Sequence, residues 1–187
     1  MANIFCNFRK KNLSFWWHNQ GKASFFITLP TMKNLFPFCF LITAALISCD
    51  ANTVYTKNDD NFPQFRWEKG RAVVFEPTIE DVSVPYDIMI NFRHVNGFQY
   101  ADMQIRVVRI SPSGEETSKE FDFPVVDGKG DYLSECALDI CDLETDFETG
   151  AKFEETGKYT YKISHLMPPD PLPNVMEVGL VVRKSGL

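Results

Sequence analysis

Regular alternation of apolar and mostly polar residues is the feature that most constrains how this chain folds. Tyr86, Ile88, Ile90 and Phe92 stand at every second position. Because successive side chains of a strand point to opposite faces, the pattern indicates a strand that is buried on one face. The same period recurs in residues 103–107, 159–163 and 176–182, and residues 72–79 and 117–123 are further expected strands. In residues 176–182, Met176, Val178, Leu180 and Val182 are expected on one face.

Turn signals separate these segments. Asn96-Gly97 follows the first strand, and Ser111-Pro112-Ser113-Gly114 follows the next one. Pro77 interrupts residues 72–79, which indicates an edge strand or a bend. Roughly eight short strands without a helical period predict an all-β fold. We expect a single-domain antiparallel β-sandwich of the jelly-roll-like kind.

An apolar segment precedes this domain. Met32-Lys33-Asn34 is followed by about a dozen mostly apolar residues that end at Ser48 and Cys49. A basic residue, a short apolar run and a small residue before the cut are typical of a secretory signal peptide. The run is shorter than a membrane-spanning helix needs to be. The alternatives are an ordinary signal peptide, or a buried helix, with a chance cysteine.

Leu46-Ile47-Ser48-Cys49 has the pattern of a bacterial lipobox. It predicts cleavage between Ser48 and Cys49, and acylation (palmitate included) of the Cys49 thiol, which becomes the mature N-terminus. More than one acyl chain is required for stable anchoring in a membrane.

Four segments follow from this interpretation. Residues 1–31 are an upstream extension introduced by gene calling, the alternative being an amphipathic targeting arm. Residues 32–48 are the lipoprotein signal peptide. Residues 49–70 are a lipid-anchored polar tether that ends in three aromatic residues docking on the domain, namely Phe62, Phe65 and Trp67. Residues 71–187 form the β-sandwich, and the mature chain of 139 residues is long enough for a hydrophobic core.

The charge of the chain is unevenly distributed. All 25 acidic residues lie at Asp50 or later, together with 14 of the 19 Lys and Arg residues, so the mature part carries a net charge of −11. An acidic field of this kind attracts neither nucleic acid nor an anionic membrane surface. We therefore expect the lipid, and no electrostatic attraction, to hold the domain at a membrane.

Cys136 and Cys141 are the two cysteines that remain in the domain. In an oxidising compartment a disulfide that closes a small hairpin is one interpretation, and two reduced buried cysteines are the other. Their spacing is not Cys-x-x-Cys and no histidine stands near them in the sequence, so neither a redox motif nor a zinc site is indicated.

Sequence motifs of catalysis are not found. His94 and His165 are the two histidines after Cys49, and nothing in the sequence places them together or beside a nucleophile. A stripe of alternating carboxylates offers oxygen ligands for calcium, but along a strand these groups spread apart, and we expect a solvated face instead. The stripe consists of Asp142, Glu144, Asp146 and Glu148. The sequence predicts no enzyme, no metal and no cofactor.

Two regions are candidates for contacts with a partner. Arg93 and Tyr100 can line a ligand cleft, although the plainer expectation is that Arg93 pairs with a surface acid and Tyr100 packs. The proline-rich stretch 166–174 is preformed, which lowers the entropy that docking costs. Its apolar residues Leu166, Met167 and Leu172 are expected to anchor the partner, and the alternative is a rigid crossover between strands.

The mature chain resembles the GldH family of gliding motility lipoproteins of Bacteroidota. The resemblance rests on five stretches: the lipobox with Cys49-Asp50 and Val54-Tyr55, Trp67 with Phe75, Asn91-Phe92-Arg93-His94 leading to Tyr100 and Met103, Gly157-Lys158-Tyr159, and Leu172-Pro173-Asn174-Val175-Met176-Glu177-Val178-Gly179-Leu180. Gly97-Phe98-Gln99-Tyr100 departs from the family's usual Tyr-Pro-Tyr-like sequence, so a binding role of that loop does not carry over.

The resemblance implies a lipid-anchored, non-enzymatic accessory or structural subunit of the gliding and type IX secretion machinery, with envelope proteins as partners. Members of the family also occur in Bacteroidota that do not glide. The alternative is a carbohydrate- or peptide-binding envelope lipoprotein. No acidic cluster follows Cys49 directly, since Asp59-Asp60 come later. The chain therefore does not resemble the surface-export signals of this phylum, and this comparison implies an outer-membrane anchor that faces the periplasm, the alternative being the cell surface.

Overall fold

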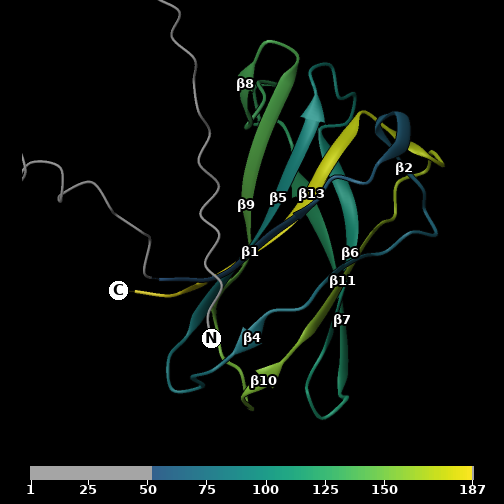
Figure 1. Cartoon of the computed structure of the whole chain (residues 1–187). Coiled ribbons are helices and arrows are strands. Elements are labelled where there is room, and N and C mark those ends of the chain that lie inside the picture. Colours follow the sequence, from purple (N-terminus) through teal and green to yellow (C-terminus); the bar gives the residue numbers. More distant parts are fainter. Residues whose placement is uncertain (1–51, 187) are drawn as a thin grey trace, which may run out of the picture. The chain divides into compact units, whose positions relative to one another are not determined.

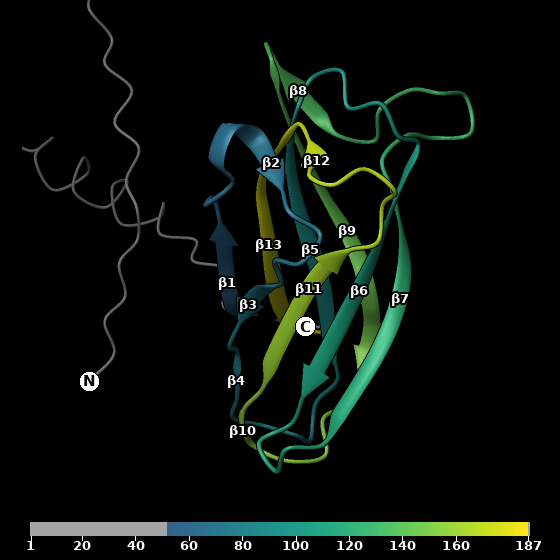
Figure 2. The same ribbon diagram turned by 90° about the vertical axis from the view of Figure 1, so that its right-hand side faces the viewer.

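Two antiparallel sheets pack face to face, as the alternation predicts (Figure 2). The computed structural model describes residues 52–186. The five-stranded sheet has the order β1 (Thr53–Asp59), β13 (Val175–Lys184), β5 (Tyr86–Val95), β9 (Ile140–Ala151), β8 (Glu135–Ala137). The four-stranded sheet has the order β3 (Val73–Phe75), β11 (Thr160–His165), β6 (Asp102–Ile110), β7 (Glu116–Pro124). The chain is therefore an antiparallel β-sandwich.

Two small sheets complete the described part of the chain. β2 (Arg66–Trp67) pairs with β12 (Leu172–Pro173), and β4 (Thr78–Ile79) pairs with β10 (Gly157–Lys158). A short 3-10 turn, η2 (Pro63–Phe65), precedes β2. Pro77 separates β3 from β4, so the expected break in this segment is confirmed. No helix among residues 52–186 is long and apolar enough to cross a bilayer.

The core lies between the two large sheets and is rich in aromatic rings. Ile88, Ile90 and Phe92 of β5 are almost completely buried. Phe92 meets Phe123 of β7 edge to face at 5.8 Å between ring centroids. Each such side chain contributes about 1.5–3 kcal/mol of burial, and favourable ring geometry adds to this. The alternation that is visible in the sequence therefore separates the inner face from the outer face of β5.

The prediction of a polar tether over residues 49–70 is wrong for residues 53–59, which form a strand of the sandwich. Residues 53–59 pair with β13 from Thr53↔Arg183 to Asp59↔Val178 and form the edge of the five-stranded sheet. Phe62 and Trp67 are buried as expected, and the Trp67 Nε1–H donates to the carbonyl oxygen of Arg71 at 2.9 Å. Phe65 remains 49% exposed. The expected segments 1–31 and 32–48, with Ser48 and Cys49, lie outside the described residues.

A bulge in β13 alters which residues of this strand face inward. The register to β5 shifts between Val175 and Glu177. As a result Val175 is buried while Met176 is only half-buried. The expectation for Met176 is thus corrected, whereas Val178, Leu180 and Val182 share the buried face.

The start of β1 and the end of β13 lie side by side, away from the β8–β9 hairpin (Figure 1). The Lys184 N–H donates to the carbonyl oxygen of Asn52 at 2.9 Å. Along β5, Asp87 pairs with Arg183 near these ends, and Val95 pairs with Ile140 at the hairpin. Val95 stands eight positions after Asp87, which is roughly 27 Å at ~3.4 Å per residue. The hairpin and the chain ends therefore mark opposite ends of the sheet.

Candidate functional site

The outer face of the five-stranded sheet carries an open hollow of about 550 Å³. Its lining is mostly polar and acidic, and it draws on five strands (β1, β5, β8, β9 and β13) and on the loop before β8. The lining residues are Asn58, Asn91, Phe92, Arg93, Leu133, Glu135, Asp142, Leu143, Glu144 and Glu177. Four carboxylates therefore stand around one arginine.

Arg93 is held in place by two of these carboxylates. Its Nε–H donates to Oδ1 of Asp142 at 2.6 Å, and its Nη1–H donates to Oε1 of Glu177. The hydrogen bond with Asp142 and the charge of Glu177 raise the pKa of Arg93 above its ordinary value. Arg183 forms a two-point pair with Glu144, at 3.1 and 3.3 Å. Three of the four carboxylates are thus neutralised by arginine.

Glu135 is the carboxylate that makes no ion pair within the described part of the chain. It stands directly opposite Asp142 in the β8–β9 pairing. Like charges at directly opposite positions destabilise a sheet. The buried carboxamide oxygen Oδ1 of Asn91, at the floor of the hollow, also accepts no hydrogen bond from residues 52–186. The hollow therefore retains acceptors that suit a cation or a hydrogen-bond donor.

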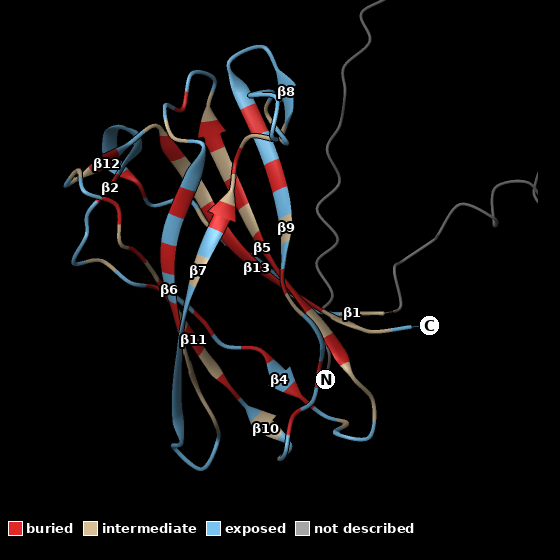
Figure 3. Ribbon diagram, turned by 180° about the vertical axis from the view of Figure 1, so that it is seen from behind, coloured by how far each residue is buried: buried red, intermediate tan, exposed pale blue. Residues whose placement is uncertain are grey.

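The tip of the β8–β9 hairpin is exposed (Figure 3). Leu138 is the first of the two residues between β8 and β9, and its side chain is 94% exposed. Its φ of +57° lies in the left-handed region, which glycine usually occupies at such a turn position. Leu133 and Ile140 are also exposed, at 47% and 41%. We call Leu133, Leu138 and Ile140 the hairpin tip cluster.

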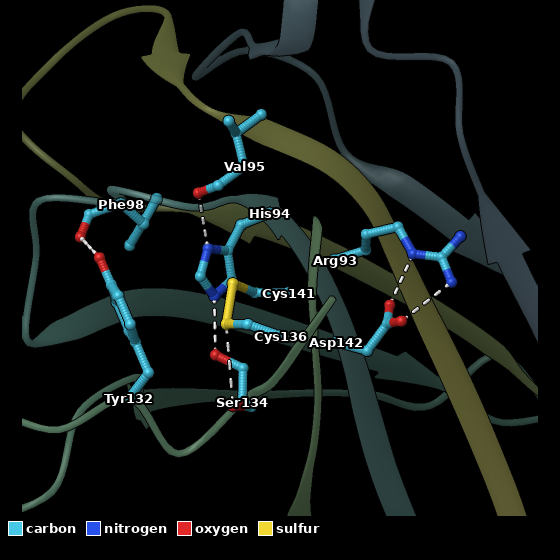
Figure 4. Close-up of a disulfide and its surroundings, with 9 residues drawn as sticks. All are labelled: Arg93, His94, Val95, Phe98, Tyr132, Ser134, Cys136, Cys141 and Asp142. Atoms are coloured by element: carbon cyan, nitrogen blue, oxygen red, sulfur yellow. Dashed lines mark hydrogen bonds and ion pairs between the residues drawn. A yellow bond between two sulfur atoms is a disulfide. The ribbon is translucent and has the colours of Figure 1, made fainter. Parts of the chain in front are cut away.

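A disulfide between Cys136 and Cys141 links the two strands of this hairpin (Figure 4). The two cysteines are direct cross-strand partners. Cys141 is buried while Cys136 is exposed. Of the two alternatives that the sequence leaves open, the structure contains the disulfide. The bond joins the hairpin to the core beside His94, the partner of Cys141 on β5.

His94 is buried on the inner side of β5, whereas Arg93 points outward (Figure 4). Its Nδ1 lies 2.9 Å from the carbonyl oxygen of Val95, and its Nε2 lies 2.9 Å from the Ser134 hydroxyl. Because a carbonyl oxygen only accepts, Nδ1 carries the proton and Nε2 of the neutral ring accepts from Ser134. Burial lowers the pKa of His94 below 6.5. The ring therefore supports the loop before β8.

His165 lies elsewhere in the core. Its Nε2–H donates to the carbonyl oxygen of Trp67 at 3.0 Å, and its ring packs against the Trp67 indole at 5.2 Å. Burial lowers the pKa of His165 as well. Each histidine is thus occupied by structural contacts, in a different part of the sandwich.

The acidic stripe follows one side of β9 only in part. Asp142 and Glu144 face the hollow, while Glu148 lies after a register shift and pairs with Arg109 at 3.6 Å. Among residues 52–186, no group of three or more His, Cys, Asp or Glu side chains is arranged to hold a metal ion. Three of the four carboxylates of the stripe therefore pair with arginines: Asp142 with Arg93, Glu144 with Arg183 and Glu148 with Arg109.

The remaining expected contact residues are divided between core and surface. Tyr100 is half-buried and packs edge to face on Phe98 at 5.5 Å. Leu166 is half-buried. Met167 and Leu172 are 5% and 0% exposed. Leu172 pairs with Trp67 of β2, and the Met167 sulfur accepts from the Gln104 N–H at 3.2 Å. The prediction that Met167 and Leu172 anchor a partner is therefore wrong, since a buried side chain does not contact one.

Sequence reasoning did not single out the hairpin tip cluster. In the sequence, Leu138 and Ile140 stand on one side of residues 131–143, with Asp139 between them. Gly128 and Gly130 before them mark a loop, but the chain has no glycine between Cys136 and Cys141 to mark a turn. Only the register of β8 on β9 shows that Leu138 is a turn residue.

Comparison with known proteins gives a consistent result. A family model described as GldH lipoprotein matches residues 53–182. A protein described as a gliding motility lipoprotein GldH homolog, from Christiangramia forsetii, is 27% identical over 156 residues, which covers 79% of this chain and 94% of that relative. No solved structure matches the chain.

Proposed function

The chain belongs to the GldH lipoprotein family, and from this premise we propose that it is a non-enzymatic, lipid-anchored accessory subunit of the gliding and type IX secretion machinery. The observation that carries the proposal is the family match across nearly the whole sandwich, together with the name of the relative. In this role the protein holds a binding surface near a membrane and contacts other envelope proteins.

The anchor of the proposed protein is Cys49. We assign cleavage between Ser48 and Cys49, with residues 32–48 removed as a signal peptide and residues 1–31 upstream of the true start. Three residues separate Cys49 from Thr53, the first residue of β1. A chain of this length spans at most about 14 Å. The sandwich would therefore sit directly at the membrane, which we place at the periplasmic face of the outer membrane.

The contacts of the two histidines support a role without catalysis. A general base needs a free nitrogen within reach of a substrate. His94 is covered by aromatic rings and bound to Ser134, and His165 is buried beneath Trp67. The hollow instead presents charged side chains, most of them in ion pairs, and such groups suit recognition.

The test of the anchor uses the full chain in the bacterium that encodes it. Mass spectrometry of the mature N-terminus is expected to find a diacylated or triacylated Cys49. Cys49→Ser is expected to move the protein from the membrane fraction to the soluble fraction, with Cys136→Ser as the control that stays in the membrane. An unchanged membrane fraction for Cys49→Ser would rule out the anchor.

The test of the role compares secretion of a type IX cargo, and surface motility where the host glides, in a deletion strain. We expect both to fall in the deletion strain and to recover with the wild-type gene. Cys49→Ser is expected to recover neither. Normal secretion and motility in the deletion strain would contradict the proposed subunit role and leave the family assignment intact.

A further inference from the structure

We propose that the β8–β9 hairpin is a docking element for a protein partner that offers an apolar pocket rimmed by Lys or Arg, with Leu138 as the side chain that enters the pocket. The inference rests on the proposed function only in assuming that the protein works through protein contacts. It adds the surface that makes the contact and the chemistry of its partner.

Neither the backbone conformation of the turn nor burial in the core explains why residue 138 is a leucine. Its φ of +57° is disfavoured for a side chain with a Cβ atom, and glycine would remove that penalty. At 94% exposure it also adds nothing to the core. A leucine that costs backbone energy and gains no burial within its own domain gains burial when a partner covers it.

The hairpin is presented in a preformed shape. β8 pairs with β9 at three positions. The disulfide between Cys136 and Cys141 closes the hairpin, with four residues between the two cysteines. Beneath it, His94 and Ser134 hold the preceding loop by a 2.9 Å hydrogen bond. Docking a rigid element loses less conformational entropy than docking a flexible loop.

The charges around the tip define the rim of the partner's pocket. Glu135 and Asp142 stand opposite each other, and Asp139 is the second turn residue. Arg93 compensates Asp142 but is shared with Glu177, and Glu135 has no cation among the described residues. A Lys or Arg on the partner would relieve this repulsion.

Other occupants fit less well. An anionic membrane is repelled by these carboxylates, and the tip lies roughly 27 Å along the sheet from the row of Thr53, near the proposed anchor. A second copy of the chain would bring a domain with a net charge of −11 against an acidic face. A basic and apolar protein surface matches both the charge and the exposed leucine.

The experiment uses the full-length protein in its own bacterium, with a photo-reactive amino acid at Ile140, which is 41% exposed on the hairpin. The matched position is Val74 on β3, which is 44% exposed on the other sheet. We expect light to give a covalent adduct with another protein from position 140 and none from position 74. Mass spectrometry of the adduct is expected to place the linked residue in an apolar pocket bordered by Lys or Arg.

Two substitutions then test the two parts of the proposal. Leu138→Gly is expected to lower the yield of adduct about tenfold or more, the loss typical of a central anchor residue. The unfolding temperature of this variant should equal or exceed that of the wild type, which excludes misfolding as the cause. Glu135→Lys is expected to lower the yield as well, whereas Glu116→Lys on the exposed strand β7 leaves it unchanged.

The remaining outcomes overturn the inference. These are an adduct with lipid, an adduct between two copies of the chain, no adduct from position 140, or a yield that neither Leu138→Gly nor Glu135→Lys changes. A charge-dependent adduct with a protein outside the secretion and gliding machinery would uphold the docking site and contradict the proposed function. If deletion of the gene abolished secretion but position 140 gave no adduct, the proposed function would be upheld and the docking site contradicted.

Discussion

The side-chain carboxamide of Asn58 lies directly over the Cα of Gly179, its partner on the neighbouring strand β13. A Cβ atom added at residue 179 would stand 2.0 Å from Oδ1 of Asn58 and 3.0 Å from Cβ of Asn91. The bare backbone of glycine thus lets Asn58 cross the sheet and donate to Glu177 at 3.1 Å. This contact closes one side of the hollow.

We predict that Gly179→Ala lowers the free energy of unfolding by about 1 kcal/mol, since Asn58 must rotate away and lose its hydrogen bond. Urea denaturation of the purified protein measures the change. Asn58→Ala in the same chain should recover most of the loss by removing the clash. Gly128→Ala, where the new Cβ meets nothing within 4 Å, is the control. Equal effects of Gly179→Ala with and without Asn58 would show that the two residues are not coupled.

The two buried histidines predict how stability depends on pH. Burial lowers the pKa of both His94 and His165 in the folded protein below the value of 6.5 expected in the unfolded chain. The unfolded state therefore binds more protons as the pH falls below 6.5. The free energy of unfolding should be constant above pH 7 and decrease as the pH falls from 6.5 toward 5.

Denaturation at pH 7.5 and pH 5.5 checks this prediction. Asp81 and Glu155, whose pKa values are lowered below 3.8 and 4.5 by hydrogen bonds from serines, stay ionised across that range. His94→Gln with His165→Gln should flatten the profile between the two pH values. A profile that remains as steep in the double variant would assign the dependence to other groups.

Removing the disulfide should destabilise the hairpin. Closing a loop of this size stabilises a protein by about 2 kcal/mol in the chain-entropy model. Cys136→Ser is the suitable variant, because Cys136 is exposed and the buried Cys141 keeps its sulfur in the core. Hydrogen exchange of the β8 amides should accelerate, while exchange in β6 and β11 stays as in the wild type. Unchanged protection of β8 would mean that the strand pairing alone holds the hairpin.

The aromatic residues before β3 should be essential for folding. Trp67→Ala removes a fully buried indole that packs on His165 and should cost about 3–5 kcal/mol. Phe65→Ala, two residues away and 49% exposed, is the matched control and should change stability by about 0.5 kcal/mol or less. Urea denaturation compares the two. Equal effects would mean that residues 62–67 do not form part of the core.

The strands that could be predicted from sequence are those with one face in the core. In β5 the buried positions alternate with the outer ones, so the period alone identifies the strand. β1 escaped prediction because it is an edge strand, and its exposed positions are Val54, Thr56, Lys57 and Asn58. Only pairing with β13 reveals it.

In the candidate site, too, some residues could be predicted from the sequence and others could not. Arg93 was singled out from its place on an alternating strand, and it lies in the hollow. Leu172 was expected to be exposed because prolines surround it, yet its pairing with Trp67 buries it. Leu138 was expected to share a face with Ile140, but the turn between β8 and β9 carries it into solvent. Exposure at a turn depends on strand register, which composition does not encode.

The backbone hydrogen bond from Lys184 to Asn52 has a practical consequence for labelling. Since the chain enters and leaves the sandwich at the same place, a fluorescent protein fused after residue 187 would be attached at the opposite extremity from Leu138. Such a fusion would crowd the lipid-proximal side and leave the hairpin unobstructed. Microscopy of the tagged protein should therefore report its position in the envelope without masking the surface through which we propose it works.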